Sequence, residues 1–440
     1  MTMRRRFLPP LLVALAGLLL ASCTQNTGGG FSDSPSPVPT ASAAPAQLDL
    51  RSLASIRAAA ATALGAHLHG GVPDLSWGGG TAAQVAGPYA DAAPEADALA
   101  LEAIRSLALT PAAGGQGTAG QGEAAAAATA QAFKELDGPR GGAFLLLVDG
   151  AHPQPPAAPA GVDPTPSSCS TPNPASITPD CLSRQVTDGL YAAWYAPDTK
   201  MFFKAGETST IYRPVDALAV GAALVVGGFR THEEQKIQAG ANIIQREMRT
   251  DIDGHFGMLA GLVTATAAGG HDITDYNTRL ADQAGAAEIL LEAFDASREQ
   301  QYMADAQKLL QPLLDERVQL RVGSGGYLPG FDLQSSGPPD HGPSDVVATL
   351  LVLQAARHYD RDDGDHFARL EETAAAALMT LVGSDRKLGG DPGAGLPAGV
   401  PESGFGARSG LVTALAVVVL GDVARDLGQA TASPATSSSP

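Results

Sequence analysis

One unit, residues 273–332, constrains the fold more than any other stretch of the sequence. Its first expected helix, residues 275–296, is apolar on nearly every side, so neighbouring elements must cover most of its surface. Its second, residues 299–316, carries one apolar stripe at helical spacing, which predicts a single buried side. That stripe consists of Tyr302, Ala306, Leu309 and Leu313. A glycine-rich return, GSGGYLPG, follows. The unit therefore predicts an inner helix, an outer helix and a tight corner.

The same unit recurs along the chain. Glycine-rich corners follow alternate helices, roughly 55–70 residues apart, as in repeat architectures. The regularity fails once, where a Pro-rich insertion at residues 150–181 replaces an inner helix. The chain is thus predicted to be all-α, an (α/α)6 toroid of six helical hairpins over residues 48–428. Helices are expected at residues 49–67, 93–109, 121–136, 182–195, 213–228, 232–249, 275–296, 299–316, 343–360, 364–382 and 404–427.

Two of the expected helix starts carry a capping-box pattern. The segments are THEE at residues 231–234 and SREQ at residues 297–300. In such a box the first hydroxyl and the fourth side chain bond the free amide groups of the helix start. We therefore expect Thr231 and Ser297 to be N-caps.

The N-terminal segment has the features of an export signal. Three arginines precede the short apolar run FLPPLLVALAGLLL, and residues 1–22 end in small residues before Cys23. The LASC ending resembles a bacterial lipobox, which predicts that Cys23 is the lipid-modified first residue of the mature protein; an ordinary signal peptide is the alternative. Residues 23–47 then form a flexible tether, and residues 429–440 a disordered tail. The protein is expected in the bacterial cell envelope, held on a membrane by its lipid anchor.

Charge and cysteine content narrow the possible partners. The formal charge of −18 argues against nucleic acid as a partner. After export only Cys169 and Cys181 remain, both within the Pro-rich insertion, and an exported pair favours a disulfide over two free thiols. The sequence contains no phosphate-binding loop, so no cofactor is expected. A protein partner stays unknown.

The long outer-to-inner connections are expected to gather at one rim, where a binding site would lie. Glycoside chemistry needs two carboxyl groups, about 5–10 Å apart, in different protonation states. Asp275 and Asp345 stand at two expected inner-helix starts and form the candidate acid–base pair; N-capping is the alternative for each. Candidate ligand-binding residues on the same loops are Glu207, Tyr212, Asp216, Tyr276, Tyr327 and Asp340. Tyr327 is also a candidate hydrophobic plug of its corner.

The sequence does not predict a metal site. The DIDG segment at residues 251–254 lacks the further ligands of a calcium loop. His255, His271 and His341 lie in three separate loops, and scattered loop histidines seldom converge.

Five short motifs occur in order between residues 48 and 425. They are His69–Asp74 with Gly78–Gly80, Pro139–Phe144 with Asp149, Thr274–Tyr276, Gly325–Tyr327, and Asp340–Ser344. In this order they resemble the six-hairpin domain of the spermatogenesis-associated protein 20 family and its bacterial thioredoxin-fused relatives. The resemblance implies a six-hairpin glycosidase-like fold. The chain lacks the thioredoxin domain, and most rim motifs are altered; PVDA, for example, stands where the family has WNGL. These departures point to a degenerate copy.

Two classes of function therefore remain. The first is an exported lipoprotein with a non-catalytic or degenerate toroid that binds a small sugar, a short glycan or a protein partner. The second is a carbohydrate-active enzyme, a glycoside hydrolase or a sugar epimerase-like protein, with paired carboxylates in the toroid mouth. Two carboxyl groups within about 10 Å favour catalysis. Bonding of Asp275 and Asp345 to backbone amides favours binding.

Overall fold

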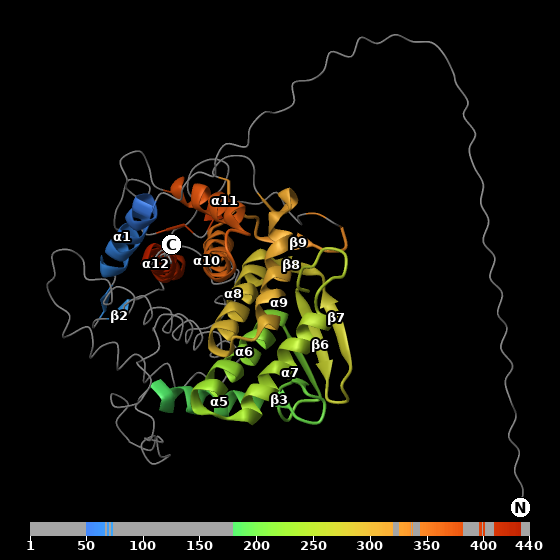
Figure 1. The fold of residues 1–440 in the computed structure, drawn as a ribbon. Coiled ribbons are helices and arrows are strands. Elements are labelled where there is room, and N and C mark those ends of the chain that lie inside the picture. Colours follow the sequence, from blue (N-terminus) through green and yellow to red (C-terminus); the bar gives the residue numbers. More distant parts are fainter. Residues whose placement is uncertain are drawn as a thin grey trace, which may run out of the picture. The chain divides into compact units, whose positions relative to one another are not determined.

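The structure is a computed structural model that describes residues 50–66, 68–69, 72–73, 179–319, 325–335, 337, 344–381, 396–397, 399–400 and 409–432. Every described residue belongs to one compact unit, Pro45–Pro440 (Figure 1). The predicted signal peptide, Cys23, Cys169, Asp340 and the helices expected at 93–109 and 121–136 lie outside the described residues. Cys181 lies in a described helix, but its side chain is outside this description.

Long helices dominate the described part of the chain. They are α1 (Leu50–Ala66), α5 (Pro179–Trp194), α6 (Pro214–Thr231), α7 (Glu234–Thr250), α8 (Leu280–Ser297), α9 (Gln300–Leu310), α10 (Val346–Asp363), α11 (Ala368–Met379) and α12 (Gly410–Ala432). Each overlaps an expected helical segment, with ends that differ from the expected ones by up to six residues. The helical class predicted from the apolar periodicity is therefore confirmed.

Four helices, α6, α8, α10 and α12, pack side by side in chain order. They are buried along most of their length, as their apolar sequences predict. α6 is apolar and long enough to cross a membrane, but 78% of it is buried inside the protein, as befits a core helix.

Outer helices cover this inner row. α7, α9 and α11 each pack against the inner helix that precedes them, and α1 packs against α12 (Figure 1). The stripe of Tyr302, Ala306, Leu309 and Leu313 is buried, so the single buried side predicted for the outer helix is confirmed. Each hairpin thus joins a buried inner helix to an amphipathic outer helix.

Short antiparallel strands fill the connections between outer and inner helices. The largest sheet joins β5 (Ser209–Tyr212), β6 (Leu262–Thr266) and β7 (His271–Asp275). β8 (Asn277–Arg279) pairs with β9 (Gly330–Asp332) just before α8. The remaining strands are β1 (Leu68–His69), β2 (Val72–Pro73), β3 (Tyr195–Ala196), β4 (Met201–Phe202), β10 (Ser344–Asp345) and β11 (Gly399–Val400). The sequence pattern predicts helices alone and does not predict these strands.

Several predicted helix ends are wrong. The helix expected to start at residue 275 starts at Leu280, because the residues before it form β7 and β8. The helix expected to reach residue 316 ends at Leu310, and Pro312, which has no N–H to donate, lies in the 3₁₀ turn that follows. Both predicted capping boxes are also wrong. Thr231 and Ser297 are the last residues of α6 and α8, and their hydroxyls donate to the carbonyls of Gly227 and Ala293.

The closest approach of α6 and α7 lies at Gly221 and Gly240. A Cβ on Gly240 would overlap the carbonyl oxygen of Gly221 and lie 2.9 Å from the backbone nitrogen of Val225. A Cβ on Gly221 would lie 2.8 Å from a side-chain carbon of Ile244. The backbones of the two helices therefore pack with only hydrogen atoms between them at this point.

We predict that Gly240→Ala lowers the free energy of unfolding by about 3 kcal/mol, because the obstacle is helix backbone that cannot yield. The matched control is Gly189→Ala in α5, where nothing lies within 4 Å of the added Cβ. That variant should be unchanged or up to about 1 kcal/mol more stable, since alanine favours a helix over glycine. Urea unfolding of both variants checks the prediction, and equal stability of the two would contradict it.

Candidate active site

The residue before each inner helix occupies the same position in its hairpin. Arg213, Arg279 and Asp345 are the N-cap residues of α6, α8 and α10, and Ser409 precedes α12. They recur at nearly equal intervals along the sequence. Arg213 and Asp282 connect the starts of α6 and α8, and the charges of Asp282 and Arg279 act on Asp345 at the start of α10. Helix N-termini carry a partial positive charge, so carboxylates are stabilised at this end.

Arg213 links the starts of α6 and α8. Its Nε and Nη2 donate to the two carboxylate oxygens of Asp216, at 3.2 and 3.0 Å, and its Nη1 lies 3.6 Å from Oδ1 of Asp282. The three side chains are between 8% and 13% exposed. Bidentate, charge-assisted contacts of this kind fix the guanidinium in both position and plane. The result is a buried ion cluster that spans two neighbouring inner helices.

Asp345 continues this cluster to α10. Its Oδ1 accepts hydrogen bonds from the backbone N–H groups of Val347, at 2.8 Å, and Ala348, at 3.3 Å. Burial raises the pKa of Asp345 to about 7; the negative charge of Asp282 raises it as well, while the cap hydrogen bonds and Arg279 lower it. The carboxyl group therefore changes its protonation state near neutral pH. A proton donor and an arginine-bound carboxylate lie on adjacent helix starts, which is an arrangement suited to acid–base chemistry.

Asp275 does not begin an inner helix, and this placement corrects the expectation. It ends β7, and its Oδ1 accepts from the backbone N–H and the side-chain amide of Asn277, both at 2.9 Å. This turn carries the chain from β7 into β8, which separates Asp275 from the start of α8. Asp345 does begin an inner helix and caps it. The pairing of Asp275 with Asp345 stays a prediction, and the carboxylate whose charge acts on Asp345 is that of Asp282.

The described candidate ligand-binding residues differ in their exposure, and their role in binding stays a prediction. Tyr212 and Tyr327 are buried, whereas Tyr276 is 37% exposed. Glu207 lies on the surface 3.5 Å from Lys204, and Asp216 is bonded to Arg213. The burial of Tyr327 agrees with the alternative that its side chain fills the interior of the glycine-rich corner as a hydrophobic plug.

Sequence reasoning missed Arg213, Arg279 and Asp282. A signal for them exists, because the pattern R-x-x-D occurs at residues 213–216 and again at 279–282, one hairpin apart. In both copies the arginine is the N-cap and the aspartate lies in the first helical turn.

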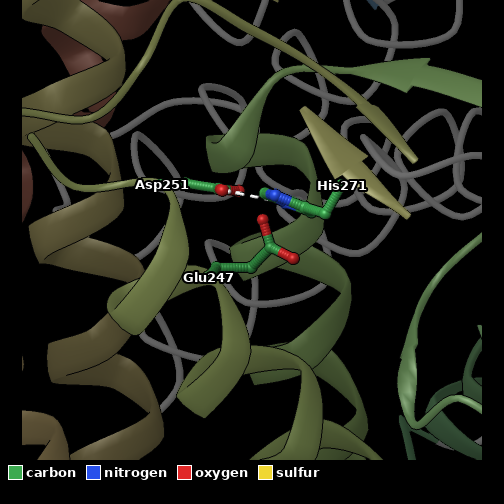
Figure 2. Close-up of side chains that lie close together, drawn as sticks. All are labelled: Glu247, Asp251 and His271. Carbon is green, nitrogen blue, oxygen red and sulfur yellow. Dashed lines mark ion pairs between the residues drawn. The ribbon is translucent and has the colours of Figure 1, made fainter. Parts of the chain in front are cut away.

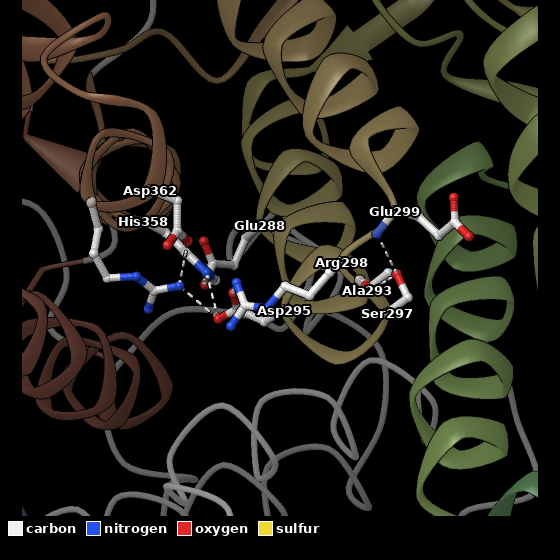
Figure 3. Close-up of polar contacts among 9 residues, drawn as sticks. Glu288, Ala293, Asp295, Ser297, Arg298, Glu299, His358 and Asp362 are labelled. Atoms are coloured by element: carbon white, nitrogen blue, oxygen red, sulfur yellow. Dashed lines mark hydrogen bonds and ion pairs between the residues drawn. The ribbon is translucent and has the colours of Figure 1, made fainter. Parts of the chain in front are cut away.

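A second polar network joins α8 and α10 far along each helix from these starts (Figure 3). His358 lies between Glu288, 3.0 Å from its Nδ1, and Asp295, 3.2 Å from its Nε2. Burial alone would lower the pKa of His358, but these carboxylates raise it well above its ordinary value. Arg361 adds a further contact to Asp295 at 2.6 Å. His358 and Arg361 therefore bridge the carboxylates of Glu288 and Asp295 and link α8 to α10, while the second oxygen of Glu288 has no hydrogen-bond partner within the described residues.

No protein-family model matches the chain, and no curated protein sequence matches it either. Solved structures do match. A crystal structure of an unsaturated glucuronyl hydrolase specific for heparin has a TM-score of 0.60 at 12% identity, over 85% of this chain and 97% of that chain. D-mannose isomerase has a TM-score of 0.58 at 10% identity, over 85% and 97%. The unsaturated glucuronyl hydrolase from Bacillus sp. GL1 has a TM-score of 0.56 at 13% identity, over 84% and 96%.

These structures share the six-hairpin glycosidase-like architecture, and the likeness extends over most of this chain. The fold of the chain is therefore the (α/α)6 toroid predicted from its repeating hairpins. At such low identity the likeness shows the fold alone, and the chemistry has to be argued from the site.

We predict that Asp345→Asn makes the protein more stable relative to the wild type as the pH rises. The folded pKa of about 7 lies above the ordinary value of 3.8, so between these values the folded state holds a proton that the unfolded chain has released. Wild-type stability therefore falls through this window, by at most about 1.4 kcal/mol per pH unit from this group. Asparagine keeps the N-cap and has no such proton.

Chemical denaturation of both proteins between about pH 5.5 and pH 8 measures the difference. Asp345→Ala serves as the comparison, because it also removes the carboxyl group but loses the cap, which costs about 1 kcal/mol at every pH. A constant difference between wild type and Asp345→Asn across this range would contradict the prediction.

Proposed function

We propose that this chain is a carbohydrate-active enzyme that acts on a small sugar or a short glycan at the starts of α6, α8 and α10. One observation carries the proposal: Asp345 is a buried carboxyl group with a pKa near 7, and Asp282 lies close enough to raise that pKa. Acid–base chemistry on sugars uses two carboxyl groups whose environments separate their roles. The solved structures with this fold, a glucuronyl hydrolase and a mannose isomerase among them, support the substrate class.

The proposed roles follow from the contacts of each group. Asp345 is the proton donor, because it retains its proton up to neutral pH. Asp282 is the ionised partner, because the Arg213 guanidinium beside it favours the negative charge. Arg213 is a positioning residue, held in place by Asp216. Glycoside hydrolysis and sugar epimerisation both need a proton donor and a proton acceptor, and this pair supplies them for either reaction.

A second candidate function is a toroid that binds a glycan but does not catalyse a reaction on it. The hydrogen bonds of Asp275 to Asn277 and of Asp345 to Val347 and Ala348 favour it, because these carboxylates stabilise the backbone whether or not catalysis occurs. In this case sugar affinity persists without any reaction. The low aromatic content of 5% agrees with a small ligand under both proposals.

We also propose a distant relationship to the spermatogenesis-associated protein 20 family. Two of the five supporting motifs lie within the described residues. Thr274–Tyr276 spans the junction of β7 and β8. Gly325–Tyr327 forms a corner in which Gly325 and Gly326 have φ angles of 70° and 100°, a region that favours glycine. The proposal rests on these motifs and on the shared six-hairpin architecture.

The location proposed for the protein is the bacterial cell envelope, with Cys23 carrying the lipid anchor. We predict that Cys23→Ser moves the protein from the membrane fraction to the soluble fraction of bacterial cells and abolishes incorporation of labelled palmitate. Acyl chains supply the apolar burial that holds such a protein on a membrane. Ser22→Ala keeps the small residue before the cysteine and is the control. Palmitate labelling of the Cys23→Ser variant would contradict the proposal.

We predict that Asp345→Asn and Asp282→Asn each lower kcat on an accepted sugar substrate by about 10²–10⁴-fold, the usual contribution of one acid–base group. The substrate is found by screening the wild type against chromogenic glycosides and a panel of free sugars followed by NMR. Asp275→Asn is the matched control, and its kcat should stay within a few-fold of the wild type.

Two outcomes would overturn the enzyme proposal. One is full activity of both variants. The other is binding of a glycan on an array without turnover of any compound in the panel, which would favour the second candidate.

A further inference from the structure

A separate cluster of titratable side chains lies beneath the three-stranded sheet. Glu247 belongs to the last turn of α7, Asp251 follows that helix, and His271 begins β7 (Figure 2). Each of the three offers one ligand atom, and these atoms all lie within 4.8 Å of one another. His271 Nε2 is 2.9 Å from Asp251 Oδ1. The side chains therefore converge on one point from two different elements.

The two carboxylates of this cluster are completely buried. Glu247 and Asp251 are each 0% exposed. Glu247 Oε1 accepts a hydrogen bond from the Tyr212 hydroxyl at 3.1 Å. Within the described residues, Glu247 Oε2 and Asp251 Oδ2 have no hydrogen-bond donor. A buried oxygen atom without a donor is costly, so each of these atoms calls for a positively charged partner.

The charges nearby do not balance. Arg246 is the neighbouring cation, and its Nη2 donates to the carbonyl of Gly269 at 3.2 Å. One guanidinium beside two carboxylates leaves one negative charge. The carboxyl end of α7 adds further negative potential.

The network in Figure 3 provides the contrast. There both ring nitrogens of His358 face carboxylates, and Arg361 supplies an additional positive charge. At the α7 cluster, by comparison, a single ring nitrogen faces Asp251, and two buried carboxylate oxygens lack donors. The first network therefore has two cationic side chains among its carboxylates, although Glu288 Oε2 also lacks a donor there, whereas Arg246 is the one arginine of the described residues beside the two carboxylates of the second.

We propose that Glu247, Asp251 and His271 bind one divalent transition-metal ion, with Zn²⁺ as the best fit. One imidazole and two carboxylates are ligands that Zn²⁺ accepts, at bond lengths of about 2.0–2.2 Å, and small side-chain rotations bring the three atoms to that distance. Tyr212 donates to Glu247 and orients it as an outer partner of the metal. The side chain of His271 is 10% exposed, which leaves the cluster reachable from solvent.

The site would strengthen the connection between two elements that the hydrogen bond from Arg246 to Gly269 already links. The metal would tie the end of α7 to the start of β7, beside Tyr212, the last residue of β5. The next residue after Tyr212 is Arg213, which bonds Asp216 and faces Asp282 at the candidate active site. A structural ion here would therefore hold the backbone that positions Arg213.

Isothermal titration of EDTA-treated, full-length protein with ZnCl₂ tests the proposal, together with thermal unfolding at increasing Zn²⁺. We expect one ion bound per chain and a Tm that rises by at least about 2 °C at saturating Zn²⁺. Asp251→Asn and His271→Ala should weaken Zn²⁺ binding at least about 100-fold. Tyr212→Phe should weaken it about tenfold, as loss of an outer partner does.

The matched control is His255→Ala, an exposed loop histidine that lies four residues after Asp251, contacts Phe256 and is not one of the three converging ligands; its Zn²⁺ affinity should be unchanged. Asp251→Asn preserves shape and removes a buried charge, so this variant should fold and be at least as stable as the metal-free wild type. An unchanged Tm and no binding heat in the wild type would overturn the proposal, as would wild-type affinity in His271→Ala. Neither readout depends on enzymatic activity.

Discussion

The burial of the inner helices on almost every side is the constraint from which the other features follow. A helix enclosed by neighbours has no long polar face, so its charged groups are concentrated toward its ends. Arg213, Asp216, Asp282 and Asp345 lie at the starts of α6, α8 and α10, and Glu288, in the middle of α8, is paired with His358. His358 and Asp295 lie toward the opposite ends of α10 and α8. Apolar packing thus decides where the toroid can carry chemistry.

The buried charges differ in how completely they are compensated. Bringing charges out of water is costly unless each finds a partner of good geometry. Arg213 meets two aspartates, and His358 meets two carboxylates beside Arg361. Glu247 and Asp251 share fewer positive partners. Asp345 lies between these cases, since backbone amides compensate its charge only in part and its pKa stays near neutral. Partial compensation is what leaves a group able to exchange a proton.

Much of the fold was predictable because helical periodicity is a local property of the sequence. The apolar surface of residues 280–294 and the stripe from Tyr302 to Leu313 each identify a helix and its buried side. The strands were not predictable in this way. β5, β6 and β7 have at most five residues each, and they exist through pairing between Tyr212, Val263 and Ile273, which are far apart in sequence.

The site was predictable in part for the same reason. Asp345 was identified because an aspartate before an apolar helix is a local signal. Asp275 was misplaced because the strand pairing of β8 moved the helix start to Leu280. The R-x-x-D repeat was available in the sequence, and comparing equivalent hairpin positions would have found it. The proximity of Glu247 to His271 could not be predicted from the sequence, because it depends on the pairing of β6 with β7 and on their position beside α7.

The glycine contact between α6 and α7 has a consequence for tracing the ancestry of this fold. A side chain at Gly240 would overlap the backbone of α6, and one at Gly221 would press on Ile244 and approach the carbonyl of Gly240, so both positions must remain small while the helices stay this close. Sequence identity to proteins of this architecture has fallen to between 10% and 13%, where ordinary alignment carries little information. A matched pair of tiny residues, one in each helix of a hairpin, would survive such divergence and could serve as a marker of descent.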